Sequence, residues 1–103
     1  MGDDQGGLLG MAAQLRRLQE ELKTVRAELA EQTVEASAGG GAVRVVMTGT
    51  QECREIHIAP QLLREPDVSR LPDLLRLAIN QAIHDSQAMA ARRLGPLAGG
   101  LAT

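Results

Sequence analysis

The sequence predicts an α+β fold in which three strands lie between two long helices, in the order α-β-β-β-α. Three observations predict it. Apolar residues recur at alternating intervals of three and four near the start of the chain, and a second helical apolar pattern occupies its last third. Between them lie three short segments that alternate or are rich in β-branched residues, separated by glycine-containing turns.

The first predicted helix covers residues 8–31 and would be about 36 Å long at about 1.5 Å per residue. Its apolar residues form the narrow heptad stripe of a coiled-coil helix. Such a stripe needs a cover, so we expect it to pack on the apolar face of residues 71–89 and on a second subunit. The stripe consists of Leu8, Met11, Leu15, Leu18, Leu22, Val25 and Leu29.

The middle of the chain predicts a three-stranded antiparallel meander. Residues 33–37 alternate weakly, residues 42–48 are rich in β-branched side chains, and residues 54–58 alternate again. Residues 39–41 are three glycines and residues 49–52 form a second turn, so each pair of neighbouring strands has a short connection.

The second predicted helix extends to about Arg93. Ser69 is its expected N-cap, Pro72 lies in its first turn, and Gly95-Pro96 is expected to end it. Its broad apolar stripe consists of Leu71, Leu74, Leu75, Ala78, Ile79, Ala82, Ile83 and Met89.

The composition predicts one domain that completes its core with a second copy. The chain has 103 residues and no Phe, Tyr or Trp, so aliphatic side chains and alanines must do all the packing. We expect residues 1–103 to form a single domain, with 1–7 and 95–103 flexible. The expected core or dimer seam consists of Leu15, Leu18, Leu22, Val25, Leu29, Ile79 and Ile83.

Charge and chemistry exclude several classes of function. The net charge is −2, so there is no overall attraction to nucleic acid, and any binding must come from local clusters. The sequence has no set of residues with catalytic-triad or metal-ligand spacing, so we predict no enzyme, catalytic residue, metal, cofactor or small-molecule substrate. It has no apolar run long enough for a membrane span and begins with acidic residues, so we expect a cytoplasmic protein.

The strands and the last helix also carry a family resemblance. The strand segment combines Gly41, Val43, Val45, Gly49, Cys53-Arg54, Ile56, Ile58, Pro60 and Leu62-Leu63. The last helix adds Asp73-Leu74-Leu75, Ala78, Asn80 and Ala82. In order and spacing, over about residues 8–93, this pattern resembles the YbaB/EbfC family of nucleoid-associated proteins. The resemblance implies a bacterial protein that forms an intertwined homodimer, binds duplex DNA and affects nucleoid organisation or gene expression.

The candidate DNA contacts are the basic side chains of the two helices, namely Arg16, Arg17, Lys23, Arg26, Arg92 and Arg93. Phosphate contacts of this kind give affinity with weak sequence preference. Glutamates interleave with them, so the alternative is a solvated helix face with internal ion pairs. Correspondingly, the alternative function is a protein–protein adaptor with little or no DNA binding.

Two further motifs have both a structural and a functional interpretation. Cys53 is either a redox-sensitive thiol, if it is exposed with a low pKa, or, more commonly, a buried and inert cysteine. The glycines at 39–41 lack the Lys-Ser/Thr that follows a phosphate-binding loop, so a hairpin turn accounts for them better.

Overall fold

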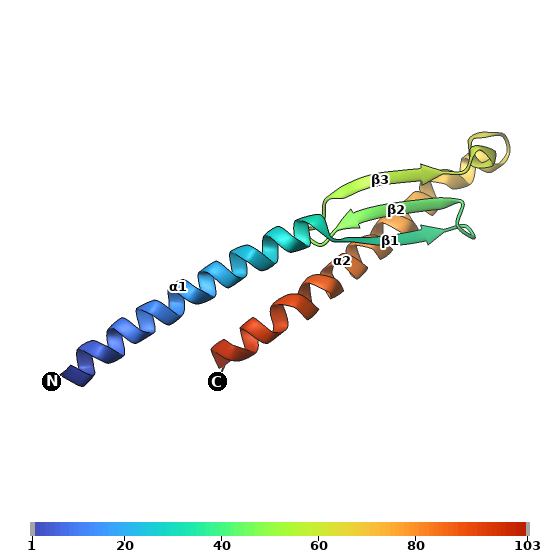
Figure 1. The fold of residues 1–103 in the computed structure, drawn as a ribbon. Helices are drawn as coiled ribbons and strands as arrows, with labels where there is room; N and C mark the ends of the chain where they lie inside the picture. The colour runs from blue at the N-terminus through green and yellow to red at the C-terminus, as the bar shows by residue number, and fades with distance from the viewer. Residues whose placement is uncertain (1, 103) are drawn as a thin grey trace.

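The computed structural model describes residues 2–102, and the side chains of residues 7–97. Its element order confirms the predicted α-β-β-β-α arrangement (Figure 1). Two short 3-10 turns lie between the last strand and the last helix. The elements are α1 (Gly2–Glu31), β1 (Thr33–Ala38), β2 (Val43–Thr48), β3 (Cys53–Ile58), η1 (Pro60–Leu63), η2 (Asp67–Arg70) and α2 (Leu71–Ala102).

The three strands form one antiparallel sheet in the order β1-β2-β3. Gly39, Gly40 and Gly41 connect β1 to β2 with φ angles of 65°, 68° and 91°, a backbone region that glycine adopts without steric cost. This confirms their interpretation as hairpin residues. The register pairs Val45 with Ala36 on one side and with Ile56 on the other, so these three side chains share one face of the sheet.

Helix α2 covers that face over β1 and β2 (Figure 1). Leu74, Ala78 and Ala82 follow each other at intervals of four, and all three are buried against the strands. The small alanines let the helix backbone approach the sheet closely, which is how a chain without aromatic residues builds a dense core. This face of α2 therefore packs on the sheet and does not cover the stripe of α1.

The same row of α2 ends in a buried polar contact. Ser86 is fully buried, and its Oγ donates a hydrogen bond to the backbone carbonyl of Thr48 at 2.7 Å. The contact fixes the last strand residue of β2 to α2, and it satisfies a hydroxyl that would otherwise be costly to bury. We call β1–β3 together with residues 71–86 of α2 the body.

The end of α1 is joined to the turn after β2. The amide of Gly49 donates to the carbonyls of Leu29 at 2.9 Å and Gln32 at 3.0 Å. A Cβ at position 49 would lie 2.9 Å from the Leu29 carbonyl oxygen and 2.8 Å from its Cδ2, so only glycine fits here without a shift. Leu29 itself is 2% exposed and is the one residue of the heptad stripe that is buried.

Two helical arms extend from the body in the same direction, and they run antiparallel to each other (Figure 1). We call residues 2–28 of α1 the first arm and residues 87–102 of α2 the second arm. The molecule measures 79 × 20 × 15 Å with a radius of gyration of 21.0 Å, against about 13 Å for a compact chain of this length. The chain is therefore elongated.

Two details of the second helix differ from the predictions. Gly95-Pro96 does not end it, because α2 continues to Ala102 with Pro96 inside it. Glycine before proline has no Cβ to clash with the ring, so the helical backbone is tolerated there. Ser69 does not cap α2 either, because its hydroxyl donates to the Pro66 carbonyl at 3.0 Å within the preceding turn.

The predicted flexibility of the two ends is a statement about motion, and it stays a prediction. Residues 2–7 and 95–102 are helical. Residues 1 and 103 lie outside the described residues.

Candidate nucleic-acid interface

The first arm carries most of the predicted basic site. Arg16, Arg17, Lys23 and Arg26 are all exposed on α1. None of the four forms an ion pair with another side chain among residues 7–97. The internal ion pairs that the alternative interpretation expects are absent from these four side chains, and the choice between DNA contact and a solvated face stays a prediction.

Most of the basic side chains of the first arm lie on a different side of the helix from Glu21 and Glu28. Glu20 is the acidic residue that lies beside Arg16 and Lys23. Arg16 and Lys23 are seven residues apart and Arg26 follows three later, so these three share one side at about 3.6 residues per turn. Glu21 and Glu28 are also seven apart, and they lie across the apolar stripe from Lys23. We call Arg16, Lys23 and Arg26 the basic flank.

Arg17 lies with the acidic side. It precedes Glu21 by four residues and Glu28 by eleven, so the helical period brings the three to one side of α1. The sequence interpretation grouped Arg17 with the other cations, but the helix separates it from the basic flank.

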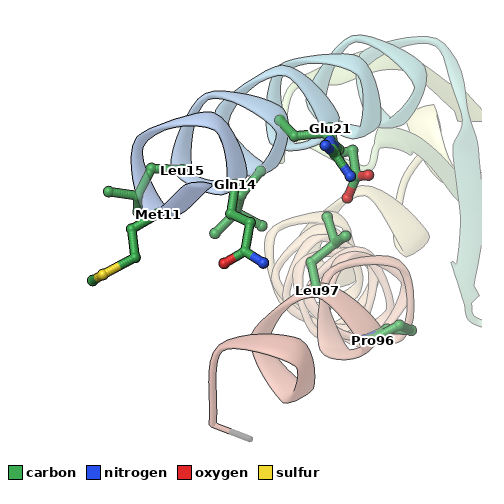
Figure 2. A pocket seen from close by; sticks show the side chains of 8 residues that line it. Met11, Gln14, Leu15, Glu21, Pro96 and Leu97 are labelled. Carbon is green, nitrogen blue, oxygen red and sulfur yellow. The ribbon is translucent and has the colours of Figure 1, made fainter. Parts of the chain in front are cut away.

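The second arm faces the acidic side of the first. Arg93 Nη2 donates to Glu28 Oε2 in an ion pair that joins the two helices, in which Arg93 is partly buried and Glu28 is exposed. Further out, Leu97 points toward Gln14 and Glu21 (Figure 2). Because α2 lies on this side, the basic flank is on the part of α1 that α2 leaves open.

The two remaining predicted cations, Arg92 and Arg93, therefore differ. Arg92 is exposed and makes no ion pair with the side chains of residues 7–97, whereas Arg93 is neutralised by Glu28. Only Arg92 presents an uncompensated charge from the second arm.

An apolar groove separates the outer parts of the arms. It has a volume of about 480 Å³ and is shown in Figure 2. Leu15 and Met11 of the heptad stripe line it but stay 56% and 62% exposed, so α2 does not cover the stripe within one chain. The groove is lined by Met11, Gln14, Leu15, Arg17, Leu18, Glu21, Pro96 and Leu97.

The rest of the predicted seam becomes more buried toward the body. Leu18, Leu22 and Val25 are partly buried, while Ile79 and Ile83 of α2 pack at the margin of the core. The expectation that these residues meet a second subunit stays a prediction.

A β-bulge places a further arginine where sequence patterns did not point. Val46 pairs with Glu55 and Met47 with Cys53, so Arg54 is the extra residue of β3. Its Nη2 donates to the carbonyl of Ala30 at 3.0 Å and lies 3.4 Å from a Glu31 carboxylate oxygen. Arg54 thus caps the carboxyl end of α1, where a cation is favoured.

Other chemistry is sparse. No group of three or more His, Cys, Asp or Glu side chains in the described part of the chain could hold a metal ion. Within the same residues, no helix has both the length and the apolar character needed to cross a membrane. Cys53 is an exposed free thiol, and His57 is exposed and bonded to Glu55 at 2.9 Å.

Comparison with known proteins identifies the family. A family model described as the YbaB/EbfC DNA-binding family matches residues 5–101. The chain belongs to this family. Membership of a DNA-binding family also confirms the prediction that the chain is not an enzyme.

Curated relatives are similar along nearly the whole chain. A nucleoid-associated protein of Acetivibrio thermocellus is 40% identical over 96 residues, which is 93% of this chain and 85% of the relative. A nucleoid-associated protein of Chloroflexus aurantiacus is 43% identical over 98 residues, 95% of each chain. The fold of this chain is also similar to the crystal structure of an uncharacterized protein from Helicobacter pylori. The TM-score is 0.69 at 20% identity, over 90% of this chain and 94% of that one.

Proposed function

We propose that this protein is a nucleoid-associated protein that binds duplex DNA as a homodimer, with weak sequence preference, in the bacterial cytoplasm. The observation that carries the proposal is the basic flank, three exposed cations on one side of a protruding helix without ion-pair partners among residues 7–97. The relatives named as nucleoid-associated and the DNA-binding family support it. In this role it would affect nucleoid organisation or gene expression.

The chemistry of the flank favours backbone contacts over base recognition. Arginine and lysine bind phosphate oxygens and release counterions, which gives affinity without sequence information. The chain has no aromatic residue on which an unpaired base could stack, so we expect it to bind single-stranded nucleic acid poorly. Duplex DNA recognised by charge and shape is the partner that fits.

A second copy is supported by the uncovered part of the sheet. Ile56 of β3 shares the face of the buried Val45, yet it is 47% exposed because α2 lies over β1 and β2. Burying that face is worth about 25 cal/mol per Å² of apolar surface. A homodimer that covers β3 would also double the number of basic flanks available to one duplex.

The DNA proposal is tested by fluorescence anisotropy with a labelled duplex between about 50 and 200 mM salt. We expect binding that weakens steeply with salt and varies little between duplex sequences. The variant Arg16→Gln/Lys23→Gln/Arg26→Gln should lose most of the affinity, and each lost phosphate contact lowers the salt slope by about 0.9.

The matched control is Arg17→Gln, which removes a cation from the acidic side of the same helix. It should bind within about twofold of the wild type, because Arg17 lies off the basic flank. Absence of binding by the wild type at micromolar protein and low salt would contradict the DNA proposal.

The homodimer is tested separately by sedimentation or light scattering. Ile56→Lys places a charge on the uncovered face and should give monomers. Ser37→Lys, on the opposite face of the sheet, should leave the mass of a dimer. A wild-type protein with a monomer mass at micromolar concentration would rule the dimer out.

The adaptor remains the second candidate function. The apolar groove between the arms and the net charge of −2 favour it, because both suit a protein partner better than a phosphate backbone. The adaptor would be favoured if the wild-type protein forms a dimer but does not bind duplex DNA in the titration.

A further inference from the structure

We propose that Glu28 is a positioning residue whose ion pair with Arg93 holds the first arm against the second and keeps the basic flank turned outward. The brace itself needs no ligand, but its consequence for DNA rests on the proposed function. Neither residue would touch DNA in this role, although Arg93 was predicted from sequence to do so.

The need for a brace follows from how α1 is attached. Its hydrogen bonds to the body lie at residues 29–32, where Gly49 and Arg54 donate to the last carbonyls of the helix. These contacts occupy about one helical turn, so they act as a single anchor at one end of a long rod. An anchor at one end resists sliding far better than it resists a change of angle.

Beyond the anchor, Leu18, Leu22 and Val25 of the first arm are partly buried. One ion pair among the side chains of residues 7–97, Glu28–Arg93, crosses to the second arm. Further out the arms are separated by the groove, and Met11 and Leu15 stay mostly exposed there. Apolar contacts are not directional, so the ion pair is the contact that we expect to set the direction of α1 relative to α2.

The distance from the pair to the tip amplifies small changes. Met11 lies 17 residues before Glu28, about 26 Å along the helix at about 1.5 Å per residue. A change of about 10° at the base would move this part of the arm by about 4.5 Å. Phosphate contacts fail at displacements of that size, so an ion pair of modest strength can control them.

The brace also decides which side of α1 faces outward. With Glu28 held by Arg93, the side that carries Glu21 and Arg17 is directed at α2, and Lys23 lies across the helix from it. Releasing Glu28 would let this acidic side turn toward bound DNA. Removal of the Glu28 charge should then weaken DNA binding, whereas simple charge counting predicts the opposite.

The brace is tested by the distance between the arms in the protein without DNA. Spin labels are placed at the exposed positions Ala13 and Ala91 in a Cys53→Ser background, and labelled chains are diluted with unlabelled ones. Glu28→Gln should lengthen or broaden the distance distribution. The matched control Glu20→Gln removes the same charge from an exposed residue without an ion-pair partner among residues 7–97, and it should leave the distribution unchanged.

A charge reversal separates the pair from either residue alone. Glu28→Arg/Arg93→Glu keeps the net charge and recreates the pair, so it should restore the wild-type distribution that Glu28→Arg alone loses. An unchanged distribution in Glu28→Gln would overturn the brace, and so would a failure of the double variant to restore it.

The duplex titration then tests the consequence for DNA. Glu21→Gln removes a charge from the same side of α1 as Glu28, at an exposed residue without an ion-pair partner among residues 7–97, and it should bind equally or more tightly than the wild type. Glu28→Gln should bind at least threefold more weakly than Glu21→Gln and more weakly than the wild type. Equal gains in both variants would overturn the effect on DNA. A wild type that binds no duplex would overturn the proposed function, while the distance measurement still decides on the brace.

Discussion

The body and the arms are built from the same aliphatic residues but held together in different ways. In the body, Val43, Val45 and Ala82 are fully buried, and strand pairing and α2 packing reinforce each other. In the first arm, Leu8 and Leu9 are both 69% exposed, and one ion pair among the side chains of residues 7–97 joins the arm to its neighbour. The body therefore carries the stability of the chain, and the arms are left available for contacts with other molecules.

The largest test of this difference compares two leucine-to-alanine variants. Leu74→Ala removes a buried side chain from the body and should cost about 2–5 kcal/mol of unfolding free energy. Leu15→Ala, in the arm, should cost less than about 1 kcal/mol because Leu15 is already 56% exposed. Urea denaturation followed by circular dichroism measures both.

Equal losses in the two leucine variants would break the comparison. They would mean that the heptad stripe is covered in solution as well as the core is, by a second copy of the chain. Repeating both denaturations in the Ile56→Lys background, which is expected to be monomeric, would then identify that case, because a loss that depends on a second copy should disappear there.

The next test uses the close approach of α2 to the sheet. Ala82→Leu adds three carbons to a fully buried row and should cost about 1–3 kcal/mol. Ala91→Leu makes the same change at an exposed position in the second arm and should be within about 0.5 kcal/mol of the wild type. Thermal unfolding of the pair checks this, and a tolerated Ala82→Leu would mean that the helix does not lie close to the strands.

How much of this could be predicted depends on whether a feature repeats along the chain. The apolar period of three and four predicted α1, and the β-branched run at residues 42–48 predicted β2, in which Val43, Val45 and Met47 alternate into the core. Both predictions were possible because a helix buries a residue on every turn and a strand buries every second residue, so the apolar pattern repeats along the sequence. The exposed stripe looked the same in sequence as a covered one, since the period does not say what lies opposite.

Features made by a single contact left no such pattern. Arg93 lies 65 residues from Glu28, and nothing in the composition of either helix links them. The β-bulge that lets Arg54 cap α1 is likewise a single feature that repeats nowhere along the chain, so no sequence pattern predicted it. The separation of Arg17 from Lys23 could have been obtained from the helical period alone, although the sequence interpretation treated them as one set. Their role at DNA stays a prediction.

A smaller effect should come from the buried hydroxyl of the body. Ser86→Ala removes the hydrogen bond to the Thr48 carbonyl and should cost about 1 kcal/mol. That carbonyl keeps a second donor, the amide of Gln51 at 3.0 Å, so the loss is limited. The control is Ser37→Ala, on the face of the sheet that points away from α2, and it should leave the free energy of unfolding unchanged. A larger loss of unfolding free energy in Ser37→Ala than in Ser86→Ala would contradict the prediction, because it would mean that the stabilising hydroxyl lies on the face that points away from α2.

The smallest effect is expected where the body meets the first arm. Arg54→Gln removes the cap on the Ala30 carbonyl, a contact of an exposed side chain that contributes about 0.3–1 kcal/mol. The change should therefore barely lower the free energy of unfolding, but it should speed hydrogen exchange of amides in the last turn of α1. Arg44→Gln, whose ion pair with Glu35 lies on the open face of the sheet, should lose similar stability without affecting those amides. Equal exchange in the two variants would show that the junction is held by Leu29 and Gly49 alone, and that the bulge in β3 does not serve the arm.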